Sequence, residues 1–220
     1  MSTPADPRPR RIILARHGEA TWTGIRYAGN TDIPLTDVGR ASAARLAGVI
    51  LASGHLADPR AVIVSSPLQR AFETACTVGA ATGRRIIVDE RWREVSFGAL
   101  EGLTFDEATA AWPNLVARMR AGDIEIDWPD GETWAGLLGR VADAWAEVVA
   151  RAVPVLVVSH GVTIRAALAH ATGAGPGGSR PFPLVTPAGT IAGCHEGDAW
   201  VVEPDWPSAA GGAVSAPEPA

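Results

Sequence analysis

The sequence predicts an α/β fold in which helices cover both faces of a mostly parallel sheet, giving a three-layer α/β/α sandwich. Short apolar runs of strand length alternate with longer segments of helical periodicity through most of the chain. This alternation is typical of parallel strands joined by crossover helices. The composition, with 47% hydrophobic and 20% charged residues, is that of an ordinary globular protein.

The first half of the chain alternates between strands and helices in a regular way. Strands are expected at residues 11–15, 60–66 and 84–89. The helix at 35–50 has Thr36 as its expected N-cap. The helix at 67–83 is expected to be capped by Ser66, with Gly83 marking its end.

The second half begins with a long irregular or short-helical region, residues 91–131, which we interpret as a lid or insert. An amphipathic helix follows, and its apolar stripe is interpreted as core packing: Trp134, Leu137, Leu138, Val141, Trp145 and Val148. A fourth strand is expected at 153–159, then a helix at 162–172 stopped by Gly173.

The ends of the chain differ in composition from its middle. We expect a flexible N-terminal arm at residues 1–10, one domain at 11–206 and a disordered tail at 207–220. Within that domain, a closing hairpin is expected about Gly197 and Asp198. The glycine-rich run 173–178 follows no strand and is interpreted as a loop.

Charge and hydropathy exclude several classes of partner. The net charge is −5 and the basic residues are scattered, so we expect no nucleic-acid partner. The apolar runs are too short to cross a membrane and the N-terminus lacks the pattern of a signal peptide, so we expect a cytoplasmic protein. Cys76 and Cys194 are interpreted as buried small hydrophobes. The sequence is compatible with a homodimer.

All nineteen basic residues are arginine. Without lysine there is no Schiff-base nucleophile, no pyridoxal-phosphate linkage and no P-loop lysine. Any bound anion must therefore be held by arginine, histidine or backbone amides.

Cationic and imidazole side chains follow three of the predicted strands. The first strand is followed by Arg16 and His17, the second by a helix whose first turn carries Arg70, and the fourth by His160. Because ligands of such sheets bind beyond the carboxyl ends of the strands, these side chains are expected to converge there.

Each of these features alone has an ordinary explanation: a surface pair, a solvated helix arginine or a core histidine. An arginine at a helix N-terminus is electrostatically unfavourable, however, and a bound anion is the simplest reason for it. Gly18 and Gly161 after the two histidines allow tight turns and a close approach to a ligand. Three such coincidences at one edge favour a pocket for a phosphoryl group.

Five segments carry a family resemblance: RHGEATW, GNTDIPLTDVGRASA, SSPLQRAFETA, REVSFGALEG and VVSHGVTIRAAL. Together they resemble the histidine phosphatase superfamily, also called phosphoglycerate-mutase-like, in family order over about residues 11–203. The resemblance implies that His17 is the nucleophile, becoming phosphohistidine, and that Arg16, Arg70 and His160 form the phosphate clamp.

The resemblance also implies that Glu94 is the general acid and base. Chemistry alone does not select it over four other carboxylates: Glu19, Asp89, Glu90 and Glu101. The structural alternative for Glu94 is an exposed partner of Arg91 or Arg93.

The implied chemistry needs no cofactor and no metal, because two arginines can hold a phosphate dianion. The same two arginines should lower the pKa of His17 and keep its imidazole neutral. We expect Glu94 to gain a proton when the phosphate dianion arrives.

The resemblance leaves phosphatase and cofactor-dependent phosphoglycerate mutase as alternatives. The mutase branch has an asparagine at the position of Thr23, which is instead expected to contribute to phosphate binding, and an Asn-Ser at the positions of Val162 and Thr163. It also has an arginine pair in its lid, whereas only Arg118 and Arg120 occur here, in no matching context. These differences favour the phosphatase branch. A non-catalytic phosphate-binding module is the alternative of another class.

The expected substrate is a small phosphorylated metabolite, and its identity is left open. Four apolar side chains could form a wall over the phosphate or belong to the core: Tyr27, Trp92, Phe97 and Leu100.

Overall fold

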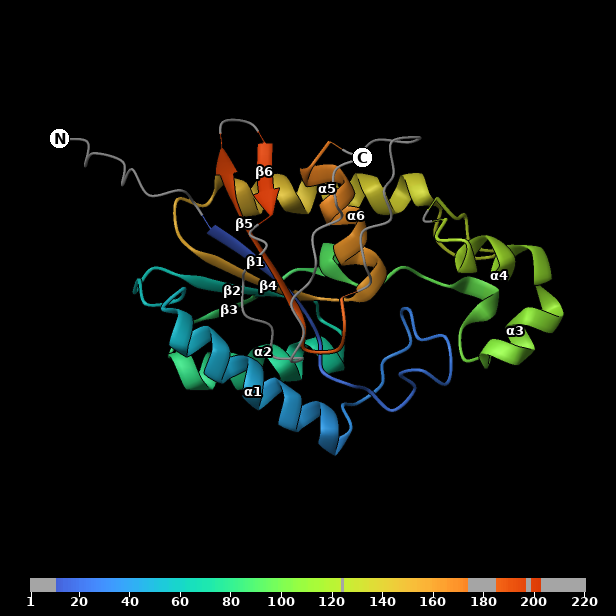
Figure 1. Cartoon of the computed structure of the whole chain (residues 1–220), viewed down its shortest axis with the longest axis horizontal. Helices are drawn as coiled ribbons and strands as arrows, with labels where there is room; N and C mark the ends of the chain where they lie inside the picture. Colours follow the sequence, from blue (N-terminus) through green and yellow to red (C-terminus); the bar gives the residue numbers. More distant parts are fainter. Residues whose placement is uncertain (1–10, 124, 174–184, 197–198, 203–220) are drawn as a thin grey trace.

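The computed structural model describes residues 11–123, 125–173, 185–196 and 199–202 (Figure 1). The expected N-terminal arm, the C-terminal tail, nearly all of the glycine-rich run 173–178 and the hairpin turn at Gly197 and Asp198 lie outside these residues.

A six-stranded sheet runs through the middle of the molecule in the order β3-β2-β4-β1-β5-β6. The strands are β1 (Arg11–Arg16), β2 (Val62–Ser65), β3 (Ile86–Val88), β4 (Val155–Ser159), β5 (Thr190–Glu196) and β6 (Ala199–Val202). The first four are mutually parallel, β5 is antiparallel to β1, and β6 is antiparallel to β5. The mostly parallel sheet and the closing hairpin are as the sequence predicts.

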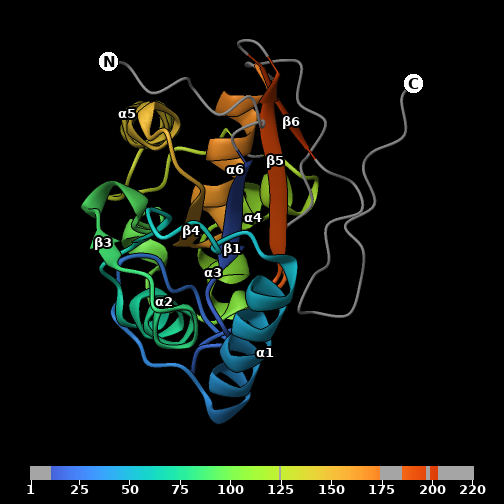
Figure 2. The same ribbon diagram turned by 90° about the vertical axis from the view of Figure 1, so that its left-hand side faces the viewer.

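Two helices cover each face of this sheet. The helices α1 (Asp37–Ser53) and α2 (Gln69–Thr82) lie on one face, and α5 (Trp134–Ala150) and α6 (Gly161–Ala171) lie on the other (Figures 1 and 2). The predicted three-layer α/β/α sandwich is therefore confirmed.

Successive side chains of β1 point alternately toward the two helical layers, so this strand packs against both. Ile12 and Leu14 belong to the apolar cluster that includes α5 and α6 residues, whereas Ile13 and Ala15 belong to the cluster that includes α1 and α2 residues. Such a strand is buried on both sides, so its sequence is a continuous apolar run rather than an alternating one. The stripe on α5 packs into the first cluster, as expected.

Helix capping agrees with the sequence at α1 but differs at α2. The Thr36 side chain caps α1 by accepting from the amide of Gly39, and Gly83 ends α2 in a left-handed conformation. Ser66 was expected to cap α2, and this is wrong, because the helix begins only at Gln69 with Leu68 as its N-cap residue, and the Ser66 hydroxyl accepts from the Leu68 amide. The carboxylate of Asp32 accepts from the Gln69 amide instead, at 2.6 Å.

A short 3-10 helix, Glu90–Trp92, leads into the region 91–131, which also contains a second 3-10 helix (Gly98–Leu100) and the helices α3 (Phe105–Ala111) and α4 (Pro113–Arg120). In Figure 1, α3 and α4 form one end of the molecule. Much of this region is packed against the rest of the protein. It contributes six buried residues to the apolar cluster that includes α5 and α6: Trp92, Val95, Phe97, Leu100, Val116 and Trp128.

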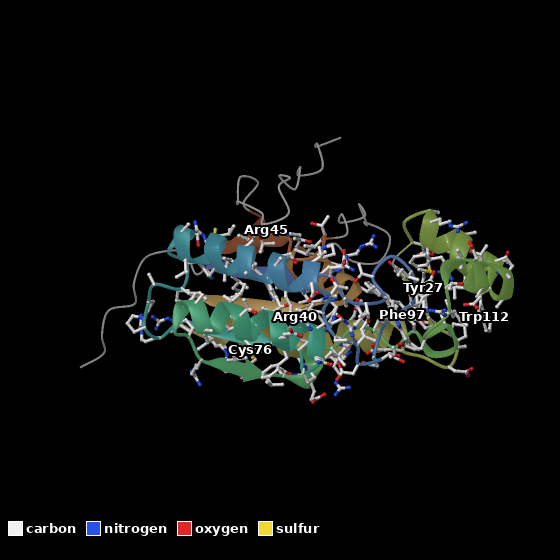
Figure 3. All side chains as sticks on the ribbon, turned by 90° about the horizontal axis from the view of Figure 1, so that it is seen from below. Tyr27, Arg40, Arg45, Cys76, Phe97 and Trp112 are labelled. Carbon is white, nitrogen blue, oxygen red and sulfur yellow. The ribbon has the colours of Figure 1, made fainter. Side chains whose placement is uncertain are left out.

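Four apolar side chains were expected either to form a wall over the phosphate or to belong to the core, and they lie in the core. Tyr27, Trp92, Phe97 and Leu100 all belong to the larger apolar cluster. The Tyr27 and Phe97 rings meet edge to face at 5.3 Å, where the core meets the α3 and α4 end (Figure 3).

Cys76 and Cys194 are half-buried rather than fully buried. Among the described residues, none of the helices is both long and apolar enough to span a membrane.

Candidate active site

The strand register brings the predicted residues to one edge of the sheet. Arg16, the last residue of β1, pairs with Ser159, the last residue of β4, while Ser65 at the end of β2 pairs with Val158. The main chain of His17 continues this alignment by donating to the Ser159 carbonyl at 3.0 Å. The three strand ends therefore converge, as the sequence predicts.

His17 is buried, and its ring nitrogens are in different environments. Nδ1 lies 2.6 Å from the carbonyl oxygen of Gly18, which fixes the orientation of the ring. The pKa of His17 lies well below its usual range, chiefly because of burial and secondarily because of the charges of Arg70 and Arg16. The sequence predicts the direction of this change, but it assigns the change to the arginines rather than to burial.

Gly18 allows close packing against α1. A Cβ atom at Gly18 would lie only 2.5 Å from the carbonyl oxygen of Gly39, near the start of that helix. The glycine after His17 is therefore required by contact between two chain segments, whereas we expected it to allow a tight turn and a close approach to a ligand.

His160 lies beside His17, with the ring centroids 5.0 Å apart. Its Nε2 is 2.8 Å from the hydroxyl of Ser66, and its buried Nδ1 has no hydrogen-bond partner among the described residues. Burial is the largest cause that holds its pKa well below the usual range, followed by the charge of Arg70. Ser66, which sequence analysis treated as a helix cap, thus orients this second imidazole.

Arg70 is almost completely buried at the start of α2. Its guanidinium donates to three main-chain carbonyls, those of Ala28, Gly29 and Thr31, at 2.7–3.2 Å. Burial lowers the pKa of Arg70, and the negative charge of Glu94 opposes that change.

Arg16 is the second arginine of the cluster. Its Nη1 donates to the Val185 carbonyl at 2.9 Å, and its buried Nε has no partner among the residues described. Burial lowers its pKa, again opposed by Glu94. The two arginines therefore lie within electrostatic range of the same carboxylate.

Glu94 is buried against the N-terminus of α6. Its Oε2 accepts from the amide of Val162 at 3.1 Å, and its Oε1 accepts from the amide of Thr163 at 3.0 Å. The alternative of an exposed partner for Arg91 or Arg93 is wrong, because Arg91 pairs with Asp89 and Glu147, and Arg93 pairs with Glu90.

The other carboxylates that we considered have different partners. Glu19 accepts from the hydroxyl of Thr36 at 2.9 Å. Glu101 accepts from the amides of Gly29 and Asn30 at 3.1 and 2.9 Å. Glu101 therefore binds the amides of the loop whose carbonyls bind Arg70, a role that sequence analysis missed because these partners are about 70 residues away.

Thr23 lies in the loop between β1 and α1. Its hydroxyl accepts from the amide of Ala20 at 2.9 Å and closes a local turn. The expected contribution of Thr23 to phosphate binding stays a prediction.

In the described part of the chain, no group of three or more His, Cys, Asp or Glu side chains is arranged to hold an ion.

The chain is similar to known proteins over most of its length. The model of the histidine phosphatase superfamily (branch 1) matches residues 12–205. The bifunctional protein Rv2228c of Mycobacterium tuberculosis is 37% identical over 178 residues, which cover 80% of this chain and 48% of that protein. The chain thus spans about half the length of the first curated relatives that it matches.

Other relatives match over most of their length. A glucosyl-3-phosphoglycerate phosphatase of Mycobacterium tuberculosis is 31% identical over 205 residues, 93% of this chain and 82% of that protein. The solved structure of mycobacterial glucosyl-3-phosphoglycerate phosphatase with VO3 has a TM-score of 0.78 and 28% identity, covering 88% of this chain and 97% of the other. With the family model matching nearly the whole described domain, the chain belongs to the histidine phosphatase superfamily.

Proposed function

We propose that the protein is a metal-independent phosphomonoesterase that hydrolyses small phosphorylated metabolites through a phosphohistidine on His17. The hydrogen bond between His17 Nδ1 and the Gly18 carbonyl carries this proposal. A carbonyl oxygen only accepts, so Nδ1 must hold the hydrogen. In the neutral imidazole that the lowered pKa favours, Nε2 then has a lone pair for attack on phosphorus.

The donors for the phosphoryl oxygens are Arg16, Arg70 and His160. Arg16 Nε and His160 Nδ1 are buried and have no partner among the described residues, so an anion would satisfy both. A pair of unit charges about 4 Å apart is worth roughly 4 kcal/mol at an effective dielectric constant near 20, before desolvation. Because positioning and charge supply most of the catalysis in phosphoryl transfer, two arginines suffice.

Glu94 provides the proton transfers in this scheme. Nε2 of His17 attacks phosphorus, the bond from phosphorus to the leaving oxygen breaks, and the protonated Glu94 gives its proton to that oxygen. The resulting carboxylate then takes a proton from water, whose oxygen attacks the phosphohistidine. Inorganic phosphate leaves, and both His17 and Glu94 return to their starting states.

The names of the relatives support a small phosphorylated metabolite as substrate. They include glucosyl-3-phosphoglycerate phosphatases and a phosphoserine phosphatase from Hydrogenobacter thermophilus. The mutase alternative has less support, because Arg118, which would have to bind a second anionic group, pairs with Asp123 at 2.7 Å.

A direct test uses p-nitrophenyl phosphate. We expect hydrolysis that survives EDTA, is inhibited by vanadate, and falls to background in His17→Ala but not in His170→Ala, which alters an exposed histidine of α6. Quenched turnover should yield an acid-labile, base-stable phosphoenzyme. Activity retained by His17→Ala, or a requirement for magnesium, would contradict the scheme.

A further inference from the structure

Thr163, in the first turn of α6, contacts Glu94 through its main chain and its side chain. Its hydroxyl lies 3.0 Å from Oε1 of Glu94 and 2.6 Å from the carbonyl oxygen of Arg93. A hydroxyl has one hydrogen, so it donates to one of these oxygens at a time and bridges them. Thr163 is buried, and its hydroxyl links the Glu94 side chain to the main chain beside it.

The two carboxylate oxygens of Glu94 are held unequally. Oε1 is contacted by the Thr163 amide, the Thr163 hydroxyl and the amide of Val95, each at 3.0 Å. Among the described residues, Oε2 accepts one hydrogen bond, from the amide of Val162. An oxygen with three such contacts has little capacity left, so Oε2 is the atom better able to carry and transfer a proton.

Arg140, on α5, holds the main chain that leads to Glu94. Its Nη1 donates to the carbonyls of Arg91 and Arg93 at 2.7 and 2.9 Å, and its Nη2 approaches the carbonyl of Glu94 at 3.3 Å. Within residues 91–94, the Trp92 carbonyl is not bound by Arg140 and accepts from the Ser159 hydroxyl at 2.8 Å. All four successive carbonyls thus accept from side chains.

Arg140 is itself fixed by a two-point ion pair. Its Nε and Nη2 donate to the two carboxylate oxygens of Glu132 at 2.6 and 2.8 Å, a geometry that specifies the plane of the guanidinium. Glu132 lies just before Thr133, the N-cap of α5, so the ion pair links this helix to the turn that precedes it.

We propose that Thr163 and Arg140 are positioning residues for the proton transfer by Glu94, Thr163 anchoring Oε1 and Arg140 anchoring the main chain, so that Oε2 faces the reacting oxygen. This inference rests on the proposed function, because it takes Glu94 as the proton donor. It assigns roles to two side chains that are not among the proposed phosphate donors.

Two substrates with different leaving groups test the inference. p-Nitrophenyl phosphate releases a stabilised phenolate that needs little help from an acid, whereas β-glycerophosphate releases an alkoxide that must be protonated. Because Glu94 also activates water for the second step with either substrate, the comparison uses kcat/KM, which reports only formation of the phosphoenzyme. We expect Thr163→Val to lower kcat/KM for β-glycerophosphate about 10- to 100-fold, as misplacement of a catalytic group does, and to change kcat/KM for p-nitrophenyl phosphate and vanadate affinity little. Thr163→Ser should restore most of the loss, and Arg140→Met should act like Thr163→Val.

Matched controls come from the same helices. Thr172→Val removes the hydroxyl of the residue that caps the end of α6 and donates to the Leu168 carbonyl, and Arg151→Met removes an arginine that follows α5 and pairs with Glu147. Neither control should separate the two substrates. If Thr163→Val or Arg140→Met does not fold, as judged by circular dichroism, Thr163→Ala and Arg140→Lys address the same contacts.

Glu94→Gln separates failure of the inference from failure of the proposed function. If Glu94→Gln lowers kcat/KM selectively for β-glycerophosphate but Thr163→Val and Arg140→Met affect both substrates equally or neither, the positioning roles are wrong and the function stands. If Thr163→Ser is as impaired as Thr163→Val, the hydroxyl is not what matters. If Glu94→Gln shows no selectivity, the proposed function fails and the inference fails with it.

Discussion

Arg70 and Arg140 each donate to three main-chain carbonyls of a loop beside the candidate site, yet they differ in how their charge is balanced. Arg140 binds the carbonyls at residues 91, 93 and 94 and forms a two-point ion pair with Glu132. Arg70 binds carbonyls within residues 28–31, and no ion pair to it is found in the part of the chain that the structure describes. The charge of Arg140 is neutralised where it lies, whereas that of Arg70 is balanced only at longer range.

The loop at 28–31 is held from both sides. Arg70 binds its carbonyls, while Glu101 accepts from the amides of Gly29, Asn30 and Thr31 and from the Thr31 hydroxyl. A Cβ atom at Gly29 would lie 2.3 Å from Glu101 Oε1, so only glycine allows this approach. The loop thus separates Arg70 from a carboxylate that could have paired with it directly.

This difference assigns the two arginines different tasks. A neutralised arginine fixes the main chain, and an arginine without a direct counter-ion keeps its charge for an incoming anion. The comparison therefore predicts that anion binding depends on Arg70 and that proton transfer depends on Arg140.

The largest expected effect is that of Arg70→Met. Loss of a charge pair worth roughly 4 kcal/mol should lower kcat/KM for p-nitrophenyl phosphate about 10³-fold and weaken vanadate binding in parallel. Arg70→Lys keeps the charge but not the planar fork and should recover part of the loss. Vanadate titration followed by calorimetry checks this, and an equal loss of vanadate affinity in Arg140→Met would break the comparison.

A smaller effect is expected for Glu101→Gln, which keeps the shape of the side chain but removes its charge. The free energy of unfolding should fall by about 2 kcal/mol, because hydrogen bonds to a charged group weaken together. Vanadate affinity should fall as well, since the loop that positions Arg70 loosens. Urea unfolding measures the first effect, with Glu107→Gln as control.

Glu107 is exposed and caps α3, so its loss should cost less than that of Glu101. If Glu101→Gln lowers stability without changing vanadate affinity, the loop does not position Arg70.

The sequence predicts the site where local pattern and sheet geometry suffice. Arg16, His17 and His160 follow apolar strands, and parallel strands end at one edge, so their convergence needs no knowledge of packing. Arg70 follows from its place in the first turn of a helix. Glu94 comes only from the family resemblance, because several carboxylates lie nearby in sequence.

The sequence fails where a distant segment competes with a local rule. Ser66 is a reasonable helix cap to judge from its sequence neighbours. In the structure the Gln69 amide is bound by Asp32, which lies 37 residues before Gln69 in the sequence. Arg140 gives no signal in the sequence, since its carbonyl partners lie 46 to 49 residues away and bind it through main-chain atoms that any residue type carries. Supporting contacts of this kind depend on the folded backbone rather than on residue pattern.

The smallest expected effect is the share of Arg70 in the loss of stability at mildly acidic pH, where burial of two histidines is expected to act more strongly than the charge of Arg70. The pKa values of His17 and His160 are held well below their usual range, first by burial and next by Arg70. As pH falls below about 6.5, the unfolded chain binds protons on these imidazoles while the folded chain does not, so the free energy of unfolding falls. At one pH unit below the usual histidine pKa, each imidazole should lower the free energy of unfolding by about 1.4 kcal/mol in the absence of phosphate.

Urea unfolding between pH 7 and 5.5 measures the slope of the free energy of unfolding against pH. This slope should flatten in a variant carrying His17→Gln and His160→Gln. It should flatten less in Arg70→Met, because burial, the larger cause, is unchanged there. A slope that flattens as far in Arg70→Met as in the double histidine variant would show that Arg70, rather than burial, holds the two pKa values down.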